Sequence, residues 1–159
     1  MQNKELHRIS VTGIIFRLND AGKYEYLITK RSPHKKVFPN LWTVPGGGLE
    51  AGDYINEKPT TKQGHWYFAV TKALRREIKE EVNLEIDNIE YLLDITFVAN
   101  DEFHLVLSYF CKYKSGEVKL DEDSTDFKWV TLEEAGNYEL IDGILDEIKM
   151  VEEKLKARQ

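Results

Sequence analysis

The sequence predicts an α/β fold in which sheet layers lie between helices. Apolar and polar residues alternate in several segments, as they do in strands that bury one face. A central segment repeats its apolar residues at every fourth position, as a helix packed on a sheet does, and a second helical pattern ends the chain. The chain has 159 residues and contains no linker, repeat or low-complexity tract, so we expect a single domain over residues 1–159.

The N-terminal third is predicted to contain a β-hairpin and a short strand. Alternation runs through residues 9–16 and 24–28, and the turn-forming residues 19–23 lie between them. The apolar residues 41–44 are typical of a short strand, which Pro45 and the glycines after it bring to an end. We therefore expect a strand, a glycine turn and then a helix in this region.

A second hairpin and a terminal helix are predicted after the central helix. Residues 91–98 and 104–113 are rich in β-forming side chains, and polar residues 100–102 separate them. A further turn follows at residues 114–117. Residues 139–156 have the pattern of an amphipathic helix. Four of its apolar residues lie near one face: Ile141, Leu145, Ile148 and Val151.

Three glutamates share one strip of the predicted central helix. At about 100° per residue, Glu80 and Glu81 lie at about −60° and +40° from Glu77. A separate apolar stripe is placed to pack on the sheet: Leu74, Ile78 and Val82. An exposed glutamate usually gains stability from a basic residue four positions later, and none of these three has one. The strip is either a solvated acidic face or a site for a divalent cation, and the missing basic partners favour the cation.

The donor set suits a particular class of metal ion. Mg²⁺ takes oxygen ligands, usually a few carboxylates together with phosphates and water, and Mn²⁺ accepts similar ligands. The glycines at 46–48 add a backbone that can approach a metal closely, and the carbonyl of Gly46 is a candidate ligand. On their own, these glycines are equally consistent with an ordinary loop.

The two features together resemble the Nudix box, whose pattern is G, five residues, E, seven residues, then R-E-apolar-x-E-E-x-G-apolar. Gly47 and Asp53 match its first half, and residues 76–84 match its second half. Asp53 stands where the family usually has Glu, and Asn83 replaces a Gly, although Asn also adopts the left-handed conformation that ends helices. The 22 residues from 54 to 75 replace the usual seven, which is an insertion of 15.

The resemblance implies a Nudix-like α/β/α sandwich with a mixed β-sheet and a metal-dependent hydrolase activity. Such enzymes cleave a nucleoside diphosphate linked to another group, X, by attack of water on phosphorus. By position, Glu77, Glu80 and Glu81 become ligands of Mg²⁺ or Mn²⁺, and Arg76 becomes a partner that orients the loop and its acids. The proton acceptor varies within the family, so it is either a glutamate of the box or an acid of a late loop, such as Glu122 or Asp123.

Two further regions are candidates for substrate binding. In related enzymes an arginine placed like Arg31, after the second strand, helps to bind substrate, and here it lies in the basic segment 30–36. If the central helix reaches back to Trp66, that ring lies about 20° from Glu77 on the wheel and can stack on a base or sugar. In the alternative interpretation, which we favour, the aromatic residues 66–68 anchor the insertion onto the core.

The alternatives to hydrolysis are a non-catalytic Nudix-like domain that senses a nucleotide, and an enzyme similar to isopentenyl diphosphate isomerase. Loss of the metal-ligand glutamates would favour a sensor, and all of them are present. The isomerase reaction requires a reactive cysteine, and the single thiol, Cys111, lies in a late strand. Among hydrolase substrates, ADP-ribose, other nucleotide sugars, nucleoside triphosphates, dinucleoside polyphosphates and capped RNA ends all remain open.

Composition restricts the partners and the compartment. The net charge of −6 argues against a non-specific grip on DNA, which requires a basic surface. No apolar stretch is long enough to span a membrane, and no signal peptide is recognisable. One cysteine gives no disulfide framework and suits the cytoplasm. The expected partner is a small nucleoside diphosphate derivative, and a homodimer is an arrangement common among similar proteins.

Overall fold

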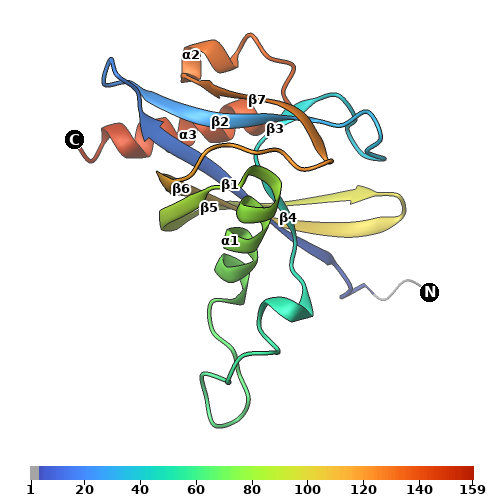
Figure 1. Ribbon diagram of the computed structural model, residues 1–159. Helices are drawn as coiled ribbons and strands as arrows, with labels where there is room; N and C mark the ends of the chain where they lie inside the picture. The colour runs from blue at the N-terminus through green and yellow to red at the C-terminus, as the bar shows by residue number, and fades with distance from the viewer. Residues whose placement is uncertain (1–3) are drawn as a thin grey trace.

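The computed structural model describes residues 4–159, and one seven-stranded sheet forms its centre (Figure 1). The strands are β1 (Arg8–Leu18), β2 (Tyr24–Arg31), β3 (Trp42–Thr43), β4 (Gly46–Gly48), β5 (Glu85–Ala99), β6 (Glu102–Ser115) and β7 (Ser124–Val130). Their order is β3-β2-β1-β6-β5, while β4 also pairs with β1 and β7 with β2. The sheet is mixed, as predicted, because β1 and β6 run parallel and every other pair is antiparallel.

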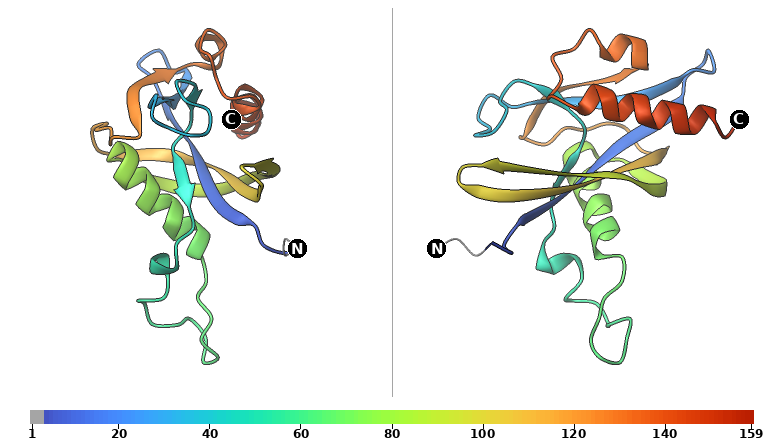
Figure 2. Two further views of the ribbon diagram at one scale, coloured as in Figure 1. Left: turned by 90° about the vertical axis from the view of Figure 1, so that its right-hand side faces the viewer. Right: turned by 180° about the vertical axis from the view of Figure 1, so that it is seen from behind.

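Helices cover both faces of the sheet and complete the predicted α/β/α sandwich (Figure 2). Helix α1 (Ala69–Val82) packs on one face, and α2 (Leu132–Ala135) and α3 (Ile144–Lys156) lie on the other. A single 3₁₀ turn, η1 (Ala51–Asp53), precedes α1. Both predicted hairpins are confirmed, since β1 pairs antiparallel with β2 and β5 with β6. No helix within residues 4–159 is long and apolar enough to cross a membrane.

The packing of α1 fixes which side of the helix faces the cleft beside it. Leu74, Ile78 and Val82 are fully buried against the sheet, as their spacing predicted. Helix and sheet approach closely at Gly13, where an added Cβ would lie 3.0 Å from side-chain carbons of Leu74 and Ile78. With this apolar stripe held on the sheet, the glutamates on the neighbouring strip turn toward β4.

The expected glycine turn is instead a strand. Gly46–Gly48 forms β4, which pairs with β1 so that Gly46 lies opposite Thr12. A Cβ at Gly46 would lie 2.2 Å from the carbonyl oxygen of Val11. The prediction of a turn was wrong. These glycines allow the backbones of β4 and β1 to approach closely, and the chain does not reverse direction there.

The C-terminal region also differs from the prediction. Helix α3 begins at Ile144 rather than at residue 139, because Leu140 forms a β-bridge with Trp42 and Gly143 has a φ of 94°. The predicted apolar face is correct at Ile148 and Val151 and wrong at Leu145, which is 39% exposed. Strand β7 and the short helix α2 were not predicted.

The inserted segment 54–68 protrudes from the body of the protein as an irregular loop (Figure 1). Helix α1 begins only at Ala69, after Phe68, whose φ is 61°. The helical position assumed for Trp66 is therefore wrong. The Trp66 ring lies 5.6 Å from that of Tyr54, and its Nε1–H donates a 2.8 Å hydrogen bond to the Glu57 carbonyl. Trp66 is bound within the insertion itself, and Tyr67 and Phe68 are exposed, so the prediction that these aromatic residues anchor the insertion onto the core was also wrong.

Candidate active site

A cleft of about 640 Å³ lies where β1, β4 and α1 meet the loops after β2 and before β7. It is lined by His7, Arg8, Ile9, Ser10, Arg31, Lys35, Gly46, Gly47, Gly48, Leu49, Glu50, Glu77, Glu81 and Asp123. Carboxylates from α1 and basic side chains from β1 and β2 thus share one opening. Two of the three predicted metal-ligand glutamates, Glu77 and Glu81, are among them.

Glu81 is the most perturbed acid of the cleft. Its carboxylate accepts a 3.0 Å hydrogen bond from the backbone N–H of Gly46. Burial raises the pKa of Glu81 to about 8, the Gly46 hydrogen bond opposes this shift, and the negative charges of Glu77, Asp121 and Asp123 add to it. Burial also raises the pKa of Glu77, against the effect of Arg76. Both carboxyl groups are therefore harder to ionise here than in water, and a cation beside them would favour their charged forms.

Arg76 joins the two halves of the box. Its guanidinium donates to both carboxylate oxygens of Asp53, at 2.5 and 3.1 Å, and to the carbonyl of Gly48 at 2.9 Å. It also lies 2.9 Å from Glu77 and 3.2 Å from Glu80. The hydrogen bond from Arg76 is the main reason that the pKa of Asp53 is lowered. Asp53 and Arg76 therefore tie the segment after β4 to α1.

Gly47 is the point of closest approach between β4 and α1. A Cβ on Gly47 would lie 2.3 Å from the carboxyl carbon of Glu77 and 2.4 and 2.5 Å from its two oxygens. Only a glycine at this position leaves the Glu77 carboxylate in place, because any side chain would occupy the same space.

The basic wall of the cleft is formed by Arg31 and Lys35. The Arg31 guanidinium donates two hydrogen bonds, 3.1 and 2.8 Å long, to the carbonyl of Val37, and this fixes the loop after β2. Burial lowers the pKa of Arg31, and the charges of Glu81 and Asp123 oppose the shift. Lys35 forms a 2.9 Å ion pair with Asp123.

The two late-loop acids are placed differently. Glu122 is exposed and is not among the residues that line the cleft, whereas Asp123 is. Of the two acids proposed from the sequence, Asp123 is therefore the one whose residue lies in the cleft. The backbone N–H of Asp121 bonds the Glu81 carbonyl at 3.2 Å and ties this loop to α1.

The residues fit a divalent metal ion in chemistry, although they are not gathered at one point. Within residues 4–159, no three acidic, histidine or cysteine side chains form a ready-made metal centre. Arg76 holds Glu77 and Glu80, and Gly46 holds Glu81. The half-buried, mutually repelling carboxylates offer only oxygen donors, which are the ligands that Mg²⁺ and Mn²⁺ prefer. A cation bound between these carboxylates would reduce their mutual repulsion.

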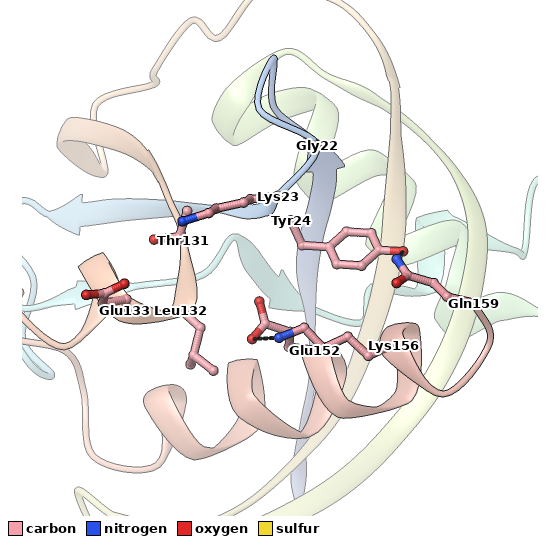
Figure 3. A pocket seen from close by; sticks show the side chains of 9 residues that line it. All are labelled: Gly22, Lys23, Tyr24, Thr131, Leu132, Glu133, Glu152, Lys156 and Gln159. Atoms are coloured by element: carbon pink, nitrogen blue, oxygen red, sulfur yellow. Dashed lines mark hydrogen bonds and ion pairs between the residues drawn. The ribbon is translucent and has the colours of Figure 1, made fainter.

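Two other features do not belong to this site. Cys111 is fully buried and burial raises the pKa of its thiol, which argues against the acid–base chemistry of an isomerase. A second cavity of about 400 Å³ lies between the β1–β2 turn, α2 and α3 (Figure 3). There Lys156 pairs with Glu152 at 3.2 Å and Gln159 bonds Tyr24 at 3.0 Å, so its polar groups bind one another.

Sequence reasoning missed the contribution of β1. Arg8 and Ser10 line the cleft because β1 lies directly beside β4, and no local motif marks either residue. Both residues reach the cleft because β1 and β4, which are far apart in the sequence, pair with each other. Trp66 is absent from the lining, and Glu80 lies at the outer edge with its side chain 58% exposed.

Comparison with known proteins agrees with this architecture. The sequence model of the NUDIX domain family matches residues 66–153. The nucleoside triphosphatase NudI of Escherichia coli K12 is 32% identical over 126 residues, which cover 72% of this chain and 79% of NudI. The NUDIX domain of Shewanella oneidensis NrtR, solved with ADP ribose, has a TM-score of 0.73 at 18% identity over 95% of this chain and 90% of that one.

A second solved structure has the same fold. The C. elegans Ap4A hydrolase binary complex has a TM-score of 0.70 at 21% identity, over 94% of this chain and 98% of that one. At this identity the likeness concerns the fold alone. The family match over more than half of the chain, together with the similarity to NudI, shows that this protein belongs to the Nudix superfamily.

Proposed function

We propose that residues 1–159 act as one Nudix hydrolase domain that uses Mg²⁺ or Mn²⁺ to cleave a diphosphate linkage in a nucleoside diphosphate joined to a group X. The family and its nucleoside triphosphatase relative support pyrophosphohydrolase activity, which acts on phosphorus-containing acid anhydrides. The substrates proposed are nucleoside triphosphates, nucleotide sugars such as ADP-ribose, and dinucleoside polyphosphates. The lone, buried thiol of Cys111 suits the reducing cytoplasm.

One observation carries this proposal: carboxylates and basic side chains line the same cleft. Glu77 and Glu81 face the side of β4, and Arg31 and Lys35 come from the opposite loop. A diphosphate with its metal ion needs both, because the metal takes carboxylate oxygens while phosphate oxygens take basic side chains. A simple acidic surface would lack the basic side chains.

The metal ligands proposed are Glu77, Glu80 and Glu81, with the carbonyl of Gly46. The bound cation would neutralise phosphate oxygens and lower the pKa of the attacking water. Arg76 holds Glu77 and Glu80 toward the cleft through its contacts with Asp53 and Gly48. The glutamates are thereby held in place before substrate binds. Little further conformational entropy is then lost when the reacting groups come together.

The remaining residues of the cleft bind phosphate and accept the proton. Arg31 is rigid because Val37 fixes its guanidinium, so it can orient a phosphate oxygen. Lys35 is paired with Asp123 and can turn from that carboxylate to a phosphate. Asp123 is then the late-loop acid placed to take the proton of the attacking water, as an alternative to a glutamate of the box.

The test is a release assay on a substrate panel in Mg²⁺, Mn²⁺ or EDTA, with nucleoside triphosphates first because NudI is named for them. The native chain is compared with a Glu80→Gln, Glu81→Gln double variant. We expect metal-dependent turnover that falls at least about a hundredfold in the double variant, since ligand changes exceed the tenfold to hundredfold effects of outer-shell changes. The matched control is Glu152→Gln, Glu153→Gln, which removes two adjacent charges from α3 and should keep activity.

The outcomes separate the two function classes. Turnover lost only in the Glu80, Glu81 variant supports the hydrolase and identifies X. Binding of a panel member without turnover in any of the three proteins would reject the hydrolase and favour a nucleotide-sensing domain.

A further inference from the structure

An ion pair joins two of the loops that line the cleft. Lys35, in the loop after β2, has its Nζ 2.9 Å from Oδ2 of Asp123, in the loop before β7. Both residues line the cleft together with Glu77 and Glu81. The proposed function needs the two groups separately, since Lys35 is to bind phosphate and Asp123 is to accept a proton. In the structure each group occupies the other.

The backbones of both loops are fixed around this pair. The carbonyl of Asp123 accepts a 2.8 Å hydrogen bond from the N–H of Ser32, which is only 3% exposed. The N–H of Asp123 donates to the carboxylate of Asp121 at 3.0 Å, and the N–H of Asp121 donates to the Glu81 carbonyl at 3.2 Å. The N–H of Lys35 donates to the Ser32 carbonyl at 3.2 Å. The pair can therefore open by rotation of its side chains, without movement of the loops.

The pair itself is weakly held. The side chains of Lys35 and Asp123 are 30% and 46% exposed, and an ion pair between partly exposed groups gains little net stability. Lysine carries its charge on a flexible stem and has three rotatable donors. Arg31, in contrast, is fixed by the two hydrogen bonds that its guanidinium donates to the Val37 carbonyl. Of Arg31 and Lys35, only Lys35 is therefore free to exchange partners.

A diphosphate is a stronger partner for Lys35 than Asp123 is. It offers more acceptor oxygens and a greater total negative charge than one carboxylate. A lysine shared by both groups would hold the diphosphate close to Asp123, and these two anions repel each other. The charge of Asp123 already contributes to the raised pKa of Glu81. A further anion beside Asp123 would add to this repulsion, so exchange is favoured over sharing.

We propose that the Lys35–Asp123 ion pair is an autoinhibitory contact that the phosphate of the substrate opens. Lys35 moves from Oδ2 of Asp123 to a phosphate oxygen, and this frees the lone pair with which Asp123 accepts a proton. The attacking water then forms its bond to phosphorus as the bridging P–O bond breaks. The leaving group takes the electron pair of that bond, and Asp123 takes a proton of the water. The role of Asp123 rests on the proposed function, whereas the exchange of Lys35 requires no turnover.

The first test measures binding and needs neither metal nor turnover. Inorganic pyrophosphate in EDTA is titrated calorimetrically into the native chain, Lys35→Gln, Asp123→Asn and the double variant. Asp123→Asn should bind about twofold to fivefold more tightly than the native chain, because no carboxylate then competes for Lys35. In the Lys35→Gln background this gain should shrink to the general effect of removing a negative charge.

The control Glu50→Gln measures that general effect. Glu50 is an acid of the same cleft, and its ion-pair partner is Arg76 rather than a lysine. Its substitution should change the Kd of pyrophosphate by the same factor with and without Lys35→Gln. The exchange of Lys35 would be overturned if Asp123→Asn bound pyrophosphate no more tightly than the native chain. The same gain in the Lys35→Gln background would also overturn it.

A second test uses turnover of the substrate identified on the panel. Lys35→Gln should raise KM by about threefold to tenfold, because a phosphate contact is lost. It should keep kcat within about twofold, because Asp123 is already free. Asp123→Asn should instead lower kcat by at least about a hundredfold. Lys36→Gln is the matched control: Lys36 is exposed and does not line the cleft, so this variant should keep both constants.

The autoinhibitory contact and the proposed function fail in different ways. Unchanged kcat in Asp123→Asn, or a loss of kcat in Lys35→Gln equal to that in Asp123→Asn, would overturn the autoinhibitory contact. Absence of turnover in the native chain would instead reject the hydrolase, and the pyrophosphate titrations would still decide whether Lys35 exchanges partners.

Discussion

Three consecutive glycines in β4 have three different surroundings, and this makes them a test of the site at the scale of single residues. Gly47→Ala would place a methyl group 2.3 Å from the Glu77 carboxyl carbon. The side chain of Glu77 can swing away, so we expect the fold to remain while turnover falls by about a hundredfold, as for a displaced catalytic group. Gly46→Ala would instead meet the Val11 carbonyl at 2.2 Å, and this clash with the backbone should lower the stability by at least about 1–3 kcal/mol.

The comparison needs turnover and thermal unfolding for each glycine variant. Gly48→Ala is the matched control, because its added methyl group meets only the Ile9 carbonyl, at 4.0 Å, and it should retain most of its activity and its Tm. Loss of activity in Gly48→Ala equal to that in Gly47→Ala would contradict the role given to Glu77.

At the scale of elements, the sequence predicted what local periodicity determines. The apolar stripe of α1, its end at Asn83 with a φ of 59°, and both hairpins are all encoded within neighbouring residues. The strand nature of β4 and the late start of α3 depend on partners far away in the chain, namely β1 and Trp42. The same division holds for the site. The helix pattern identified its glutamates and the family resemblance suggested Asp123, whereas Arg8 was missed because it reaches the cleft only through the pairing of β1 with β4.

Helix α3 contains a buried acid that gives the fold a pH dependence. Glu147 is 4% exposed and accepts a 2.6 Å hydrogen bond from Ser108. Burial raises the pKa of Glu147, and the Ser108 hydrogen bond opposes this only in part. A raised folded pKa favours the protonated form, so the stability that Glu147 contributes is complete below the pKa of an unfolded glutamate and is lost as the pH rises through the folded value.

At neutral pH, Glu147→Gln should therefore unfold at a higher temperature than the native chain. In acid the difference in Tm between the two proteins should be smaller. Each unit by which the pKa is raised corresponds to about 1.4 kcal/mol, and each kcal/mol to about 2–4 °C in Tm for a chain of this size. Thermal unfolding of both proteins from acid to neutral pH measures this difference in Tm. Asp146→Asn, which neutralises an exposed neighbour on the same helix, should show no such gain. If the Tm of Glu147→Gln were lower than that of the native chain by the same amount at every pH, the charge of Glu147 would not destabilise the fold.

At the scale of the whole molecule, the balance of charge connects folding to the site. The chain carries a net charge of −6, and its acids are packed together in the cleft at Glu77, Glu81 and Asp123. A ligand that binds only the folded state stabilises it by an amount set by its concentration relative to its Kd, about 2.7 kcal/mol at a hundredfold excess. A divalent cation bound in the cleft would relieve repulsion that the unfolded chain does not have.

Mg²⁺ or Mn²⁺ alone, without substrate, should thus raise the Tm by about 5–10 °C at a hundredfold excess over Kd. Thermal unfolding at matched ionic strength, with EDTA as the reference, measures this rise separately from turnover. The Glu80→Gln, Glu81→Gln variant should lose the rise and the Glu152→Gln, Glu153→Gln variant should keep it, because only the first pair includes Glu81, which is bonded to Gly46 of β4. An equal rise in both variants would place the stabilising cation elsewhere on an acidic surface, and turnover in Mg²⁺ would then need a different set of ligands.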